Sequence, residues 1–218
     1  EATLEKIFSS TPMLIAVHCE DETTIKNNLE RYKEEFGEDI PVTAHHLIRS
    51  EEACYISSSK AVALAKKTGA RLHIFHLSTA KEMDLFTNKI PLEDKKITAE
   101  VCIHHLWFTN DDYATKGNLI KWNPAVKTEN DRKVLWEALL DGRIDVIATD
   151  HAPHTLEEKK QSYLKAPSGG PLVQHAVVAM FESFHRGQIS VEKIVEKMCH
   201  NPAKIFKIEK RGFIKVGC

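Results

Sequence analysis

The chain has 218 residues, enough for one large domain or two small ones with a buried core. Its net charge of −1, with 28% charged and 42% hydrophobic residues, is typical of a soluble globular protein and excludes the basic surface of a nucleic-acid-binding protein. No apolar run approaches the roughly 18 residues of a membrane span, and the N-terminus lacks a signal-peptide layout, so we expect no membrane partner.

Strand-like and helical segments alternate along the chain. A helix-like stretch at 2–10 comes first, and the predicted strands are 13–18, 71–76, 96–104 and 144–149. The predicted helices are 51–69 with Gly69 at its C-terminal cap, a short one from about Thr79, 129–142, 171–187, and 190–206, whose register breaks at Pro202. Residues 212–218 look like the start of another strand. Such alternation predicts an α/β protein with parallel strands and right-handed crossovers.

Four β/α units suit either an open doubly wound sheet or half of a (β/α)₈ barrel. An open dinucleotide-binding sheet needs a G-x-G-x-x-G after its first strand, but the sequence there is "HCEDETT", and no phosphate-binding P-loop occurs. A barrel predicts reactive residues at the C-terminal ends of several strands. We therefore favour the barrel.

Three of the four predicted strands end in residues that bind metals well: His18, His76 and Asp150. The ordinary alternatives are two buried histidines and an aspartate that caps a helix. Because the strand ends of a barrel meet at one rim, the three side chains can surround one ion. Two imidazoles and a carboxylate suit zinc or a similar divalent metal, and an ionised carboxylate at the end of a buried strand needs such a partner.

The five cysteines are scattered, odd in number and contain no C-x-x-C pair. This pattern argues against a disulfide framework or a thiolate zinc site, and it favours a reducing cytoplasm. The twelve histidines are the compositional oddity, since histidine is the commonest metal ligand and proton shuttle. We expect His73, His175, His185 and His200 to be packing or surface residues, and His151 to orient the neighbouring aspartate.

Several short segments, in this order, resemble the amidohydrolase superfamily and, within it, the dihydroorotases. The segments are "HCED", "HIFHLST", "EVCIHHLWFT", "WNPAVK", "ATDHAPH" and "NPAKIF". The "DHAPH" segment is the most specific of them, because the related hydantoinases and allantoinases share the Asp-His pair but usually differ after it. The resemblance extends from about Leu14 to Phe206.

This resemblance implies a (β/α)₈ barrel of the metal-dependent hydrolase type, with the chain supplying about strands five to eight. Residues 1–206 would be the C-terminal half of the barrel, and 207–218 would start a flanking β segment. The family's H-x-H metal motif of strand one does not occur in the chain. The adjacent pairs His45-His46 and His104-His105 cannot replace it, because a strand would point each pair to opposite faces. We therefore expect a piece of a longer polypeptide.

The resemblance also implies roles for individual residues. His18 and His76 would bind one Zn²⁺, and Asp150 would bind a second metal and act as the catalytic acid/base, with one or two ions in each full-length subunit. Asn123 and His154 would contact the carboxylate side of the substrate, and the backbone around Gly169 would contact its ring. Without the resemblance, Asn123 reads as a turn residue and Gly169 as part of a flexible loop.

The implied activity is reversible hydrolysis of the cyclic amide of dihydroorotate to carbamoyl-aspartate in pyrimidine biosynthesis. Within the same class, an allantoinase or hydantoinase is the alternative. A non-catalytic homologue that assembles with aspartate transcarbamoylase is the alternative from a different class, although such a scaffold has no physical need for His18, His76 or Asp150. The resemblance is compatible with a small-molecule substrate, with homo-oligomers, with an association with aspartate transcarbamoylase, and with a cytoplasmic enzyme.

Overall fold

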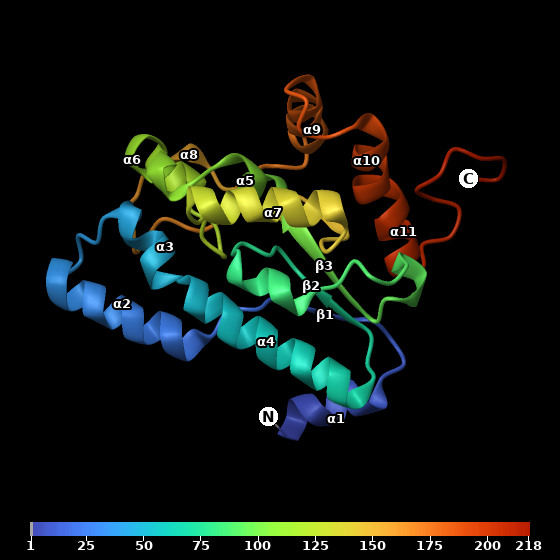
Figure 1. Ribbon diagram of the computed structural model, residues 1–218. Helices are drawn as coiled ribbons and strands as arrows, with labels where there is room; N and C mark the ends of the chain where they lie inside the picture. Colours follow the sequence, from blue (N-terminus) through green and yellow to red (C-terminus); the bar gives the residue numbers. More distant parts are fainter. Residues whose placement is uncertain (1) are drawn as a thin grey trace.

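The computed structural model describes residues 2–218 and contains one parallel four-stranded sheet (Figure 1). Its strands lie in chain order and are β1 (Ile15–Val17), β2 (Leu72–Ile74), β3 (Ile97–Cys102) and β4 (Val146–Ala148). All three pairings are parallel, which confirms the α/β fold class expected from the sequence. Within residues 2–218, β1 and β4 each pair with a single neighbouring strand, so both outer edges of the sheet are open.

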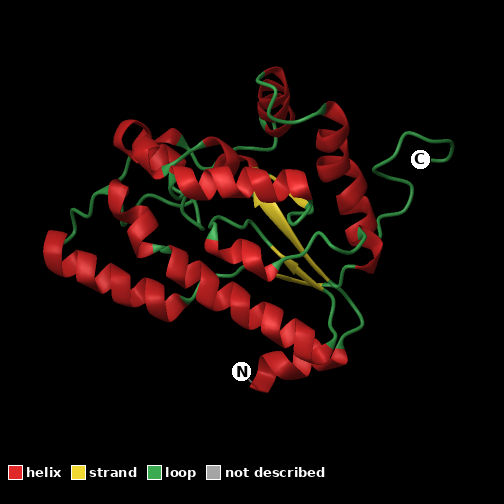
Figure 2. Cartoon of the chain, in the orientation of Figure 1, coloured by secondary structure: helices red, strands yellow, loops and turns green. Residues whose placement is uncertain are grey.

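Helices connect the strands and cover the sheet, as the colouring by secondary structure shows (Figure 2). The α-helices are α1 (Ala2–Ser10), α2 (Glu22–Phe36), α3 (His45–Ile48), α4 (Glu51–Thr68), α5 (Ile103–Trp107), α6 (Tyr113–Lys116), α7 (Glu129–Asp141), α8 (Leu156–Lys159), α9 (Ala176–His185), α10 (Val191–Val195) and α11 (Asn201–Ile205). Short 3₁₀ turns lie at Val42–Ala44, Lys81–Leu85, Leu92–Asp94, Asn110–Asp112 and Gly117–Ile120. Among the described residues, no helix has both the length and the apolarity to cross a membrane.

The hydrophobic core lies between the sheet and the long helices α4 and α7. It joins strand residues such as Leu72 and Val101 to Val62 of α4 and Leu135 of α7, all of them almost fully buried. Burial of this apolar surface is the main favourable contribution to folding. The core therefore fixes the strands, and with them the positions of the residues that follow each strand.

The boundaries of the two long helices follow from capping. The hydroxyl of Ser50 accepts a hydrogen bond from the Ala53 amide at the start of α4, and Gly69 ends that helix at φ 73°, as the sequence predicts. Thr128 and Asp131 form a reciprocal capping box at the start of α7. The predicted helices at 51–69 and 129–142 are thus confirmed to within one residue.

The structure corrects four predicted elements. The strand expected at 96–104 ends at Cys102, and α5 begins at Ile103, so the pairs His104-His105 and His45-His46 lie on helices and not on strands. The helix from Thr79 is a 3₁₀ turn, the helix expected at 171–187 begins only at Ala176, and residues 212–218 form turns and bends without a strand. A fifth difference is small: the register break expected at Pro202 occurs just before it, in a π turn at Glu196–His200, and Pro202 itself occupies the first turn of α11, where proline is tolerated.

Candidate metal centre and substrate loop

His18, His76 and Asp150 lie just beyond the C-terminal ends of β1, β2 and β4. Because these strands are parallel, their C-terminal ends point to one edge of the sheet. His76 and Asp150 have φ values of 35° and 46°, a region that side chains other than glycine seldom occupy. The backbone therefore turns abruptly at both residues, and such local strain is typical of functional sites.

The imidazoles of His18 and His76 face each other across the first two strand ends. Nδ1 of His18 lies 2.8 Å from Nε2 of His76, and Nε2 of His18 lies 3.2 Å from Oε2 of Glu20. Since a carboxylate only accepts hydrogen bonds, Nε2 of His18 carries the proton and donates it to Glu20. The lone pair of His18 Nδ1 is then directed at His76.

Glu20 is held in place by a second partner. The guanidinium Nη1 of Arg49 donates to the same Oε2 atom, and Glu20 is buried. Burial raises the pKa of this carboxyl, but the hydrogen bond from His18 and the charge of Arg49 outweigh it, so the pKa is lower than usual. Glu20 is therefore an anion that fixes the tautomer and orientation of His18, a common arrangement behind metal-binding histidines.

His76 is neutral at physiological pH. Burial, together with the neighbouring His18 and His105, lowers the pKa of His76 to about 3, against a smaller opposing effect of Glu20. Neutral imidazole is the form that binds metals. Two nitrogen ligands on a tetrahedral ion with bonds of about 2.0–2.1 Å lie roughly 3.3 Å apart. Because Nδ1 of His18 carries a lone pair, Nε2 of His76 is the donor of the 2.8 Å contact. To hold an ion between them, the two nitrogens must move apart and His76 must carry its proton on Nδ1, which has no hydrogen-bond partner among residues 2–218.

Asp150 is exposed in this chain, yet its surroundings affect its charge. Desolvation and then the negative charge of Glu100 raise the pKa of Asp150, while His18 lowers it. Asp150 is thus within electrostatic range of both His18 and Glu100, a residue of β3. A carboxylate in this position can bind a cation and can exchange a proton.

His154 and Gly169 lie together in the segment after β4. Nε2 of His154 donates to the Ser168 carbonyl at 3.2 Å, and the Gly169 amide donates to the Lys121 carbonyl at 2.9 Å. Gly169 has φ 134°, and a Cβ atom there would lie 2.5 Å from the Ala152 carbonyl oxygen. Only glycine fits at this position, so the backbone of the loop packs closely against Ala152 at Gly169.

Asn123 is connected to the histidine cluster through the next residue. The Pro124 carbonyl accepts a hydrogen bond of 3.0 Å from Nε2 of His105, and His105 lies close enough to His76 to lower its pKa. The Oδ1 atom of Asn123 is buried without a hydrogen-bond partner among residues 2–218. A buried amide oxygen without a partner is costly, which makes Asn123 available to a ligand.

Two buried lysines, Lys121 and Lys159, donate hydrogen bonds to backbone carbonyls of the loop 160–170. Nζ of Lys159 donates to the carbonyls of Lys121, Pro167 and Gly169 at 3.2, 2.9 and 2.9 Å. Nζ of Lys121 donates to the carbonyls of Tyr163 and Ala166 at 2.7 and 2.6 Å. Burial lowers the pKa of both ammonium groups to about 8. The two side chains thus satisfy five carbonyl groups of the segments that position Gly169.

Replacing Lys159 by methionine is expected to loosen this loop. The substitution leaves three carbonyl groups without their donor, and an unsatisfied buried polar group costs about 1–3 kcal/mol. Hydrogen exchange followed by mass spectrometry should show faster amide exchange in residues 160–170. Lys160→Met, at the exposed neighbouring position, is the matched control and should leave exchange unchanged. Equal protection in the two variants would show that Lys159 does not hold the loop.

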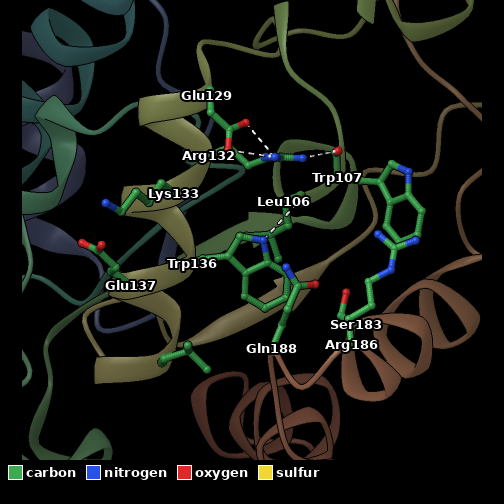
Figure 3. A pocket seen from close by; sticks show the side chains of 11 residues that line it. Leu106, Trp107, Glu129, Arg132, Lys133, Trp136, Glu137, Ser183, Arg186 and Gln188 are labelled. Carbon is green, nitrogen blue, oxygen red and sulfur yellow. Dashed lines mark hydrogen bonds and ion pairs between the residues drawn. The ribbon is translucent and has the colours of Figure 1, made fainter.

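Of two pockets of about 500 Å³, only one is lined by a predicted site residue. The pocket in Figure 3 lies among α5, α7 and α9, is lined by side chains such as Trp107, Arg132 and Trp136, and contains none of the predicted site residues. The other includes His18 in its lining, together with residues of α1 and α4. The chemistry of the strand ends, and not pocket size, therefore identifies the candidate site.

The sequence predicted the residues at three strand ends but missed several that support them. Glu20, Arg49 and Lys159 were not predicted. Glu20 could have been, because it lies two residues after His18 in the "HCED" segment, and side chains two residues apart in an extended chain lie on the same face. The end of β3 also carries ligand-type side chains, Cys102, His104 and His105, and their ligand atoms lie within 4.8 Å of one another. The "CIHH" string at a strand end was the signal for this cluster.

Comparison with known proteins identifies the family to which the chain belongs. Residues 3–218 match the amidohydrolase family. The chain is 34% identical over 209 residues to a dihydroorotase from Halobacterium salinarum, covering 96% of this chain and 46% of that protein. It is 42% identical over 159 residues to a dihydroorotase from Carboxydothermus hydrogenoformans, covering 72% of this chain and 36% of that protein.

Among solved structures, the L-hydantoinase (dihydropyrimidinase) from Arthrobacter aurescens superposes with a TM-score of 0.90 at 28% identity. The match covers 99% of this chain and 49% of that one. A D-hydantoinase superposes with a TM-score of 0.87 at 23% identity and is similar in fold. The chain therefore has the α/β fold of the TIM-barrel hydrolases, and it spans less than half the length of the relatives that it matches.

Proposed function

Because the chain belongs to the amidohydrolase family, we propose that it is part of a dihydroorotase, a metal-dependent enzyme that interconverts dihydroorotate and carbamoyl-aspartate. The observation that carries the proposal is the convergence of His18 and His76, with the tautomer of His18 fixed by Glu20, at the strand edge that also bears Asp150. The relatives at 34% and 42% identity support dihydroorotate as the substrate.

The family is generally metal-dependent, and we assign His18, His76 and Asp150 as ligands of Zn²⁺. Neutral imidazoles and a carboxylate suit zinc, and one or two ions in each full-length subunit fit this ligand set. When bound, such an ion polarises the carbonyl under attack and lowers the pKa of water to near neutrality. Glu20 and Arg49 keep His18 in the orientation that this role requires.

Asp150 is the acid/base of the proposed reaction. Its carboxylate accepts a proton from the attacking water as the new C–O bond forms at the ring carbonyl. It then donates this proton to the ring nitrogen as the C–N bond breaks, so the ring opens to carbamoyl-aspartate without a net change in protons on Asp150. The raised pKa of Asp150, caused by desolvation and by Glu100, brings the carboxyl closer to the range in which it can both accept and donate a proton.

Asn123, His154 and Gly169 are the proposed substrate contacts. The packing of Gly169 against His154 supports a preformed binding loop. The buried Oδ1 of Asn123, which has no partner among residues 2–218, can accept a hydrogen bond from a ligand N–H, and its Nδ2 group is the donor that a carboxylate would need. His154 and the Asn123 amide would bind the carboxylate side of dihydroorotate, while the backbone at Gly169 would contact the ring. Lys159 and Lys121 position this loop through hydrogen bonds to its carbonyl groups.

Replacing His154 or Asn123 by alanine should weaken substrate binding and spare the metal. Hydrogen bonds to charged groups contribute about 1.5–3 kcal/mol, so we expect KM for dihydroorotate to rise by roughly 10- to 150-fold. Metal content per subunit, measured by plasma mass spectrometry, should stay at the wild-type value. His185→Ala, at an exposed position on α9, is the control and should change neither quantity. Loss of metal from His154→Ala or Asn123→Ala would show that these residues support the metal, and that their assignment to substrate binding is wrong.

We further propose that residues 1–206 form the C-terminal half of the barrel, with β1 to β4 as strands five to eight, and that 207–218 lead into a flanking segment. The open edges of the sheet and the coverage of 46% and 49% of full-length relatives support this division. The other half would supply the remaining strands and the H-x-H ligands. All five cysteines are free, which fits a cytoplasmic enzyme.

The structural likeness to hydantoinases keeps that activity as the second candidate. Turnover of dihydroorotate, hydantoin and allantoin by the full-length protein separates the alternatives. We expect the highest kcat/KM for dihydroorotate, because "DHAPH" and the sequence relatives favour it. A preference for hydantoin or allantoin would replace the proposed substrate, and no turnover of any of them would favour a non-catalytic assembly partner, for example of aspartate transcarbamoylase.

A further inference from the structure

A second cluster of ligand-type side chains lies at the junction of β3 and α5. The strand ends at Cys102 and the helix starts at Ile103, which brings Cys102, His104 and His105 together on one short turn. One potential ligand atom from each residue lies within 4.8 Å of those of the other two. All three residues are buried, with exposed fractions of 0%, 1% and 2%.

The two imidazoles of this cluster lack the partners that buried imidazoles require. Both ring nitrogens of His104, and Nδ1 of His105, have no hydrogen-bond partner within the described part of the chain. Nε2 of His105 faces the Pro124 carbonyl at 3.0 Å and must be its donor, so Nδ1 of His105 carries the lone pair. Buried polar groups without partners cost free energy and call for an explanation.

From this geometry we propose that Cys102, His104 and His105 bind a divalent metal ion of the zinc type at a site separate from His18, His76 and Asp150. A thiolate and two imidazoles are a ligand set that zinc prefers over harder ions. An ion at this position takes the lone pair of His105 Nδ1 and one nitrogen of His104, and so satisfies groups that otherwise lack partners. The Trp122 ring stacks on His104 with centroids 4.3 Å apart and holds its plane.

The thiol of Cys102 releases its proton when the ion binds. Burial, with the nearby negative charges of Glu100 and Asp150, raises the pKa of Cys102 well above its usual value, so the residue is a neutral thiol when no cation is present. A coordinated ion stabilises the thiolate, and one proton per ion leaves to solvent. The two histidines are neutral at pH 7, because burial lowers the pKa of both, and they release no proton.

One residue of the buried cluster borders a pocket. His104 contributes to the lining of a pocket of about 430 Å³ between α5 and α9, together with Ile103, Trp107 and Leu172. Cys102 and His105 do not line this pocket, so the pocket borders the cluster at His104 alone. Because His105 also holds the Pro124 carbonyl, the ion would stiffen the backbone next to Asn123, which is a positioning role and not a catalytic one.

Cobalt substitution in the full-length protein tests the site. Co²⁺ bound to a thiolate gives a ligand-to-metal charge-transfer band in the near ultraviolet, and the ligands proposed for the catalytic centre in this chain include no cysteine. We expect this band in the Co²⁺-loaded wild type, and we expect Cys102→Ser to lose both the band and one equivalent of metal. Cys54→Ser is the matched control, since Cys54 is also buried and should leave the band and the metal content unchanged.

Two results would overturn the site. One is a Co²⁺-loaded wild type without the band, which needs no variant and so does not depend on how Cys102→Ser folds. The other is a band that persists in a folded Cys102→Ser protein. Neither result bears on the turnover of dihydroorotate, so a failure of this site and a failure of the proposed enzymatic function remain distinguishable.

Discussion

Asp150→Asn in the full-length protein is expected to lower kcat for dihydroorotate by roughly 10²- to 10⁴-fold, the usual contribution of general acid–base transfer. The asparagine side chain has nearly the same size and can still offer an oxygen to a cation. It cannot accept the proton of the attacking water or deliver one to the ring nitrogen. The fold should stay intact, because Asp150 follows the end of β4 and does not belong to the hydrophobic core.

Steady-state kinetics measure the loss of kcat, and far-ultraviolet circular dichroism checks that the fold is intact. Asp39→Asn, at an exposed position just after α2, serves as the matched control and should keep the wild-type rate. An Asp150→Asn protein that turns over dihydroorotate at nearly the wild-type kcat would remove Asp150 from the acid/base role. Its metal ligation would then need a separate test by metal analysis.

Residues 1–218 expressed alone are expected to have no dihydroorotase activity and to be insoluble or associated. This expectation rests on the proposed half-barrel. Both outer strands of the sheet have an open edge within the described residues, and α9 exposes Val177, Val178 and Phe181. Unpaired strand edges and exposed apolar patches promote association. Without the H-x-H ligands, His18, His76 and Asp150 would also hold metal poorly.

Size-exclusion chromatography with light scattering, together with a dihydroorotate assay, tests this expectation. Co-expression of the chain with the other half of the polypeptide should restore solubility and activity, because it closes both sheet edges. The same co-expression with His18→Ala in the 218-residue chain should restore solubility but not activity. A monomeric, soluble chain of 218 residues that hydrolyses dihydroorotate would refute the half-barrel.

The strands and the site residues that follow them could be predicted from the sequence because each depends on a local pattern. Runs such as "LIAV" and "DVIA" have the β-branched composition of buried strands, and a change to His or Asp marks the strand end. The parallel order then follows from the alternation with helices. The lengths differ, since β1, β2 and β4 have three residues each, and the strand expected at 212–218 does not form.

The switch from strand to helix after Cys102 could not be predicted in the same way. The run "VCIHHLW" is apolar enough for a buried strand and also fits one turn of a buried helix, so periodicity does not distinguish the two. Leu106 and Ile103 of this turn join the core and decide in favour of the helix. The prediction that a strand points the two histidines to opposite faces was wrong for this reason.

The supporting contacts depend on residues that are distant along the chain. Glu20 is near His18 in sequence, but Arg49, which holds it, comes from the segment between α3 and α4. Lys159 reaches carbonyl groups of Lys121 and of 167–169, and a lysine has no sequence signal for such a role. Tertiary structure is needed to find groups whose partners are backbone carbonyls.

Metal dependence of dihydroorotate turnover tests the central claim most directly. The full-length protein is stripped with a chelator, and the rate of carbamoyl-aspartate formation is measured while Zn²⁺ is added back in known amounts. We predict no turnover in the stripped protein and full recovery on addition of Zn²⁺ to wild type, but not to a folded double variant with His18→Ala and His76→Ala. Turnover that survives complete removal of metal, or that returns in the double variant to the wild-type level, would contradict the assignment of these strand-end residues as the metal centre.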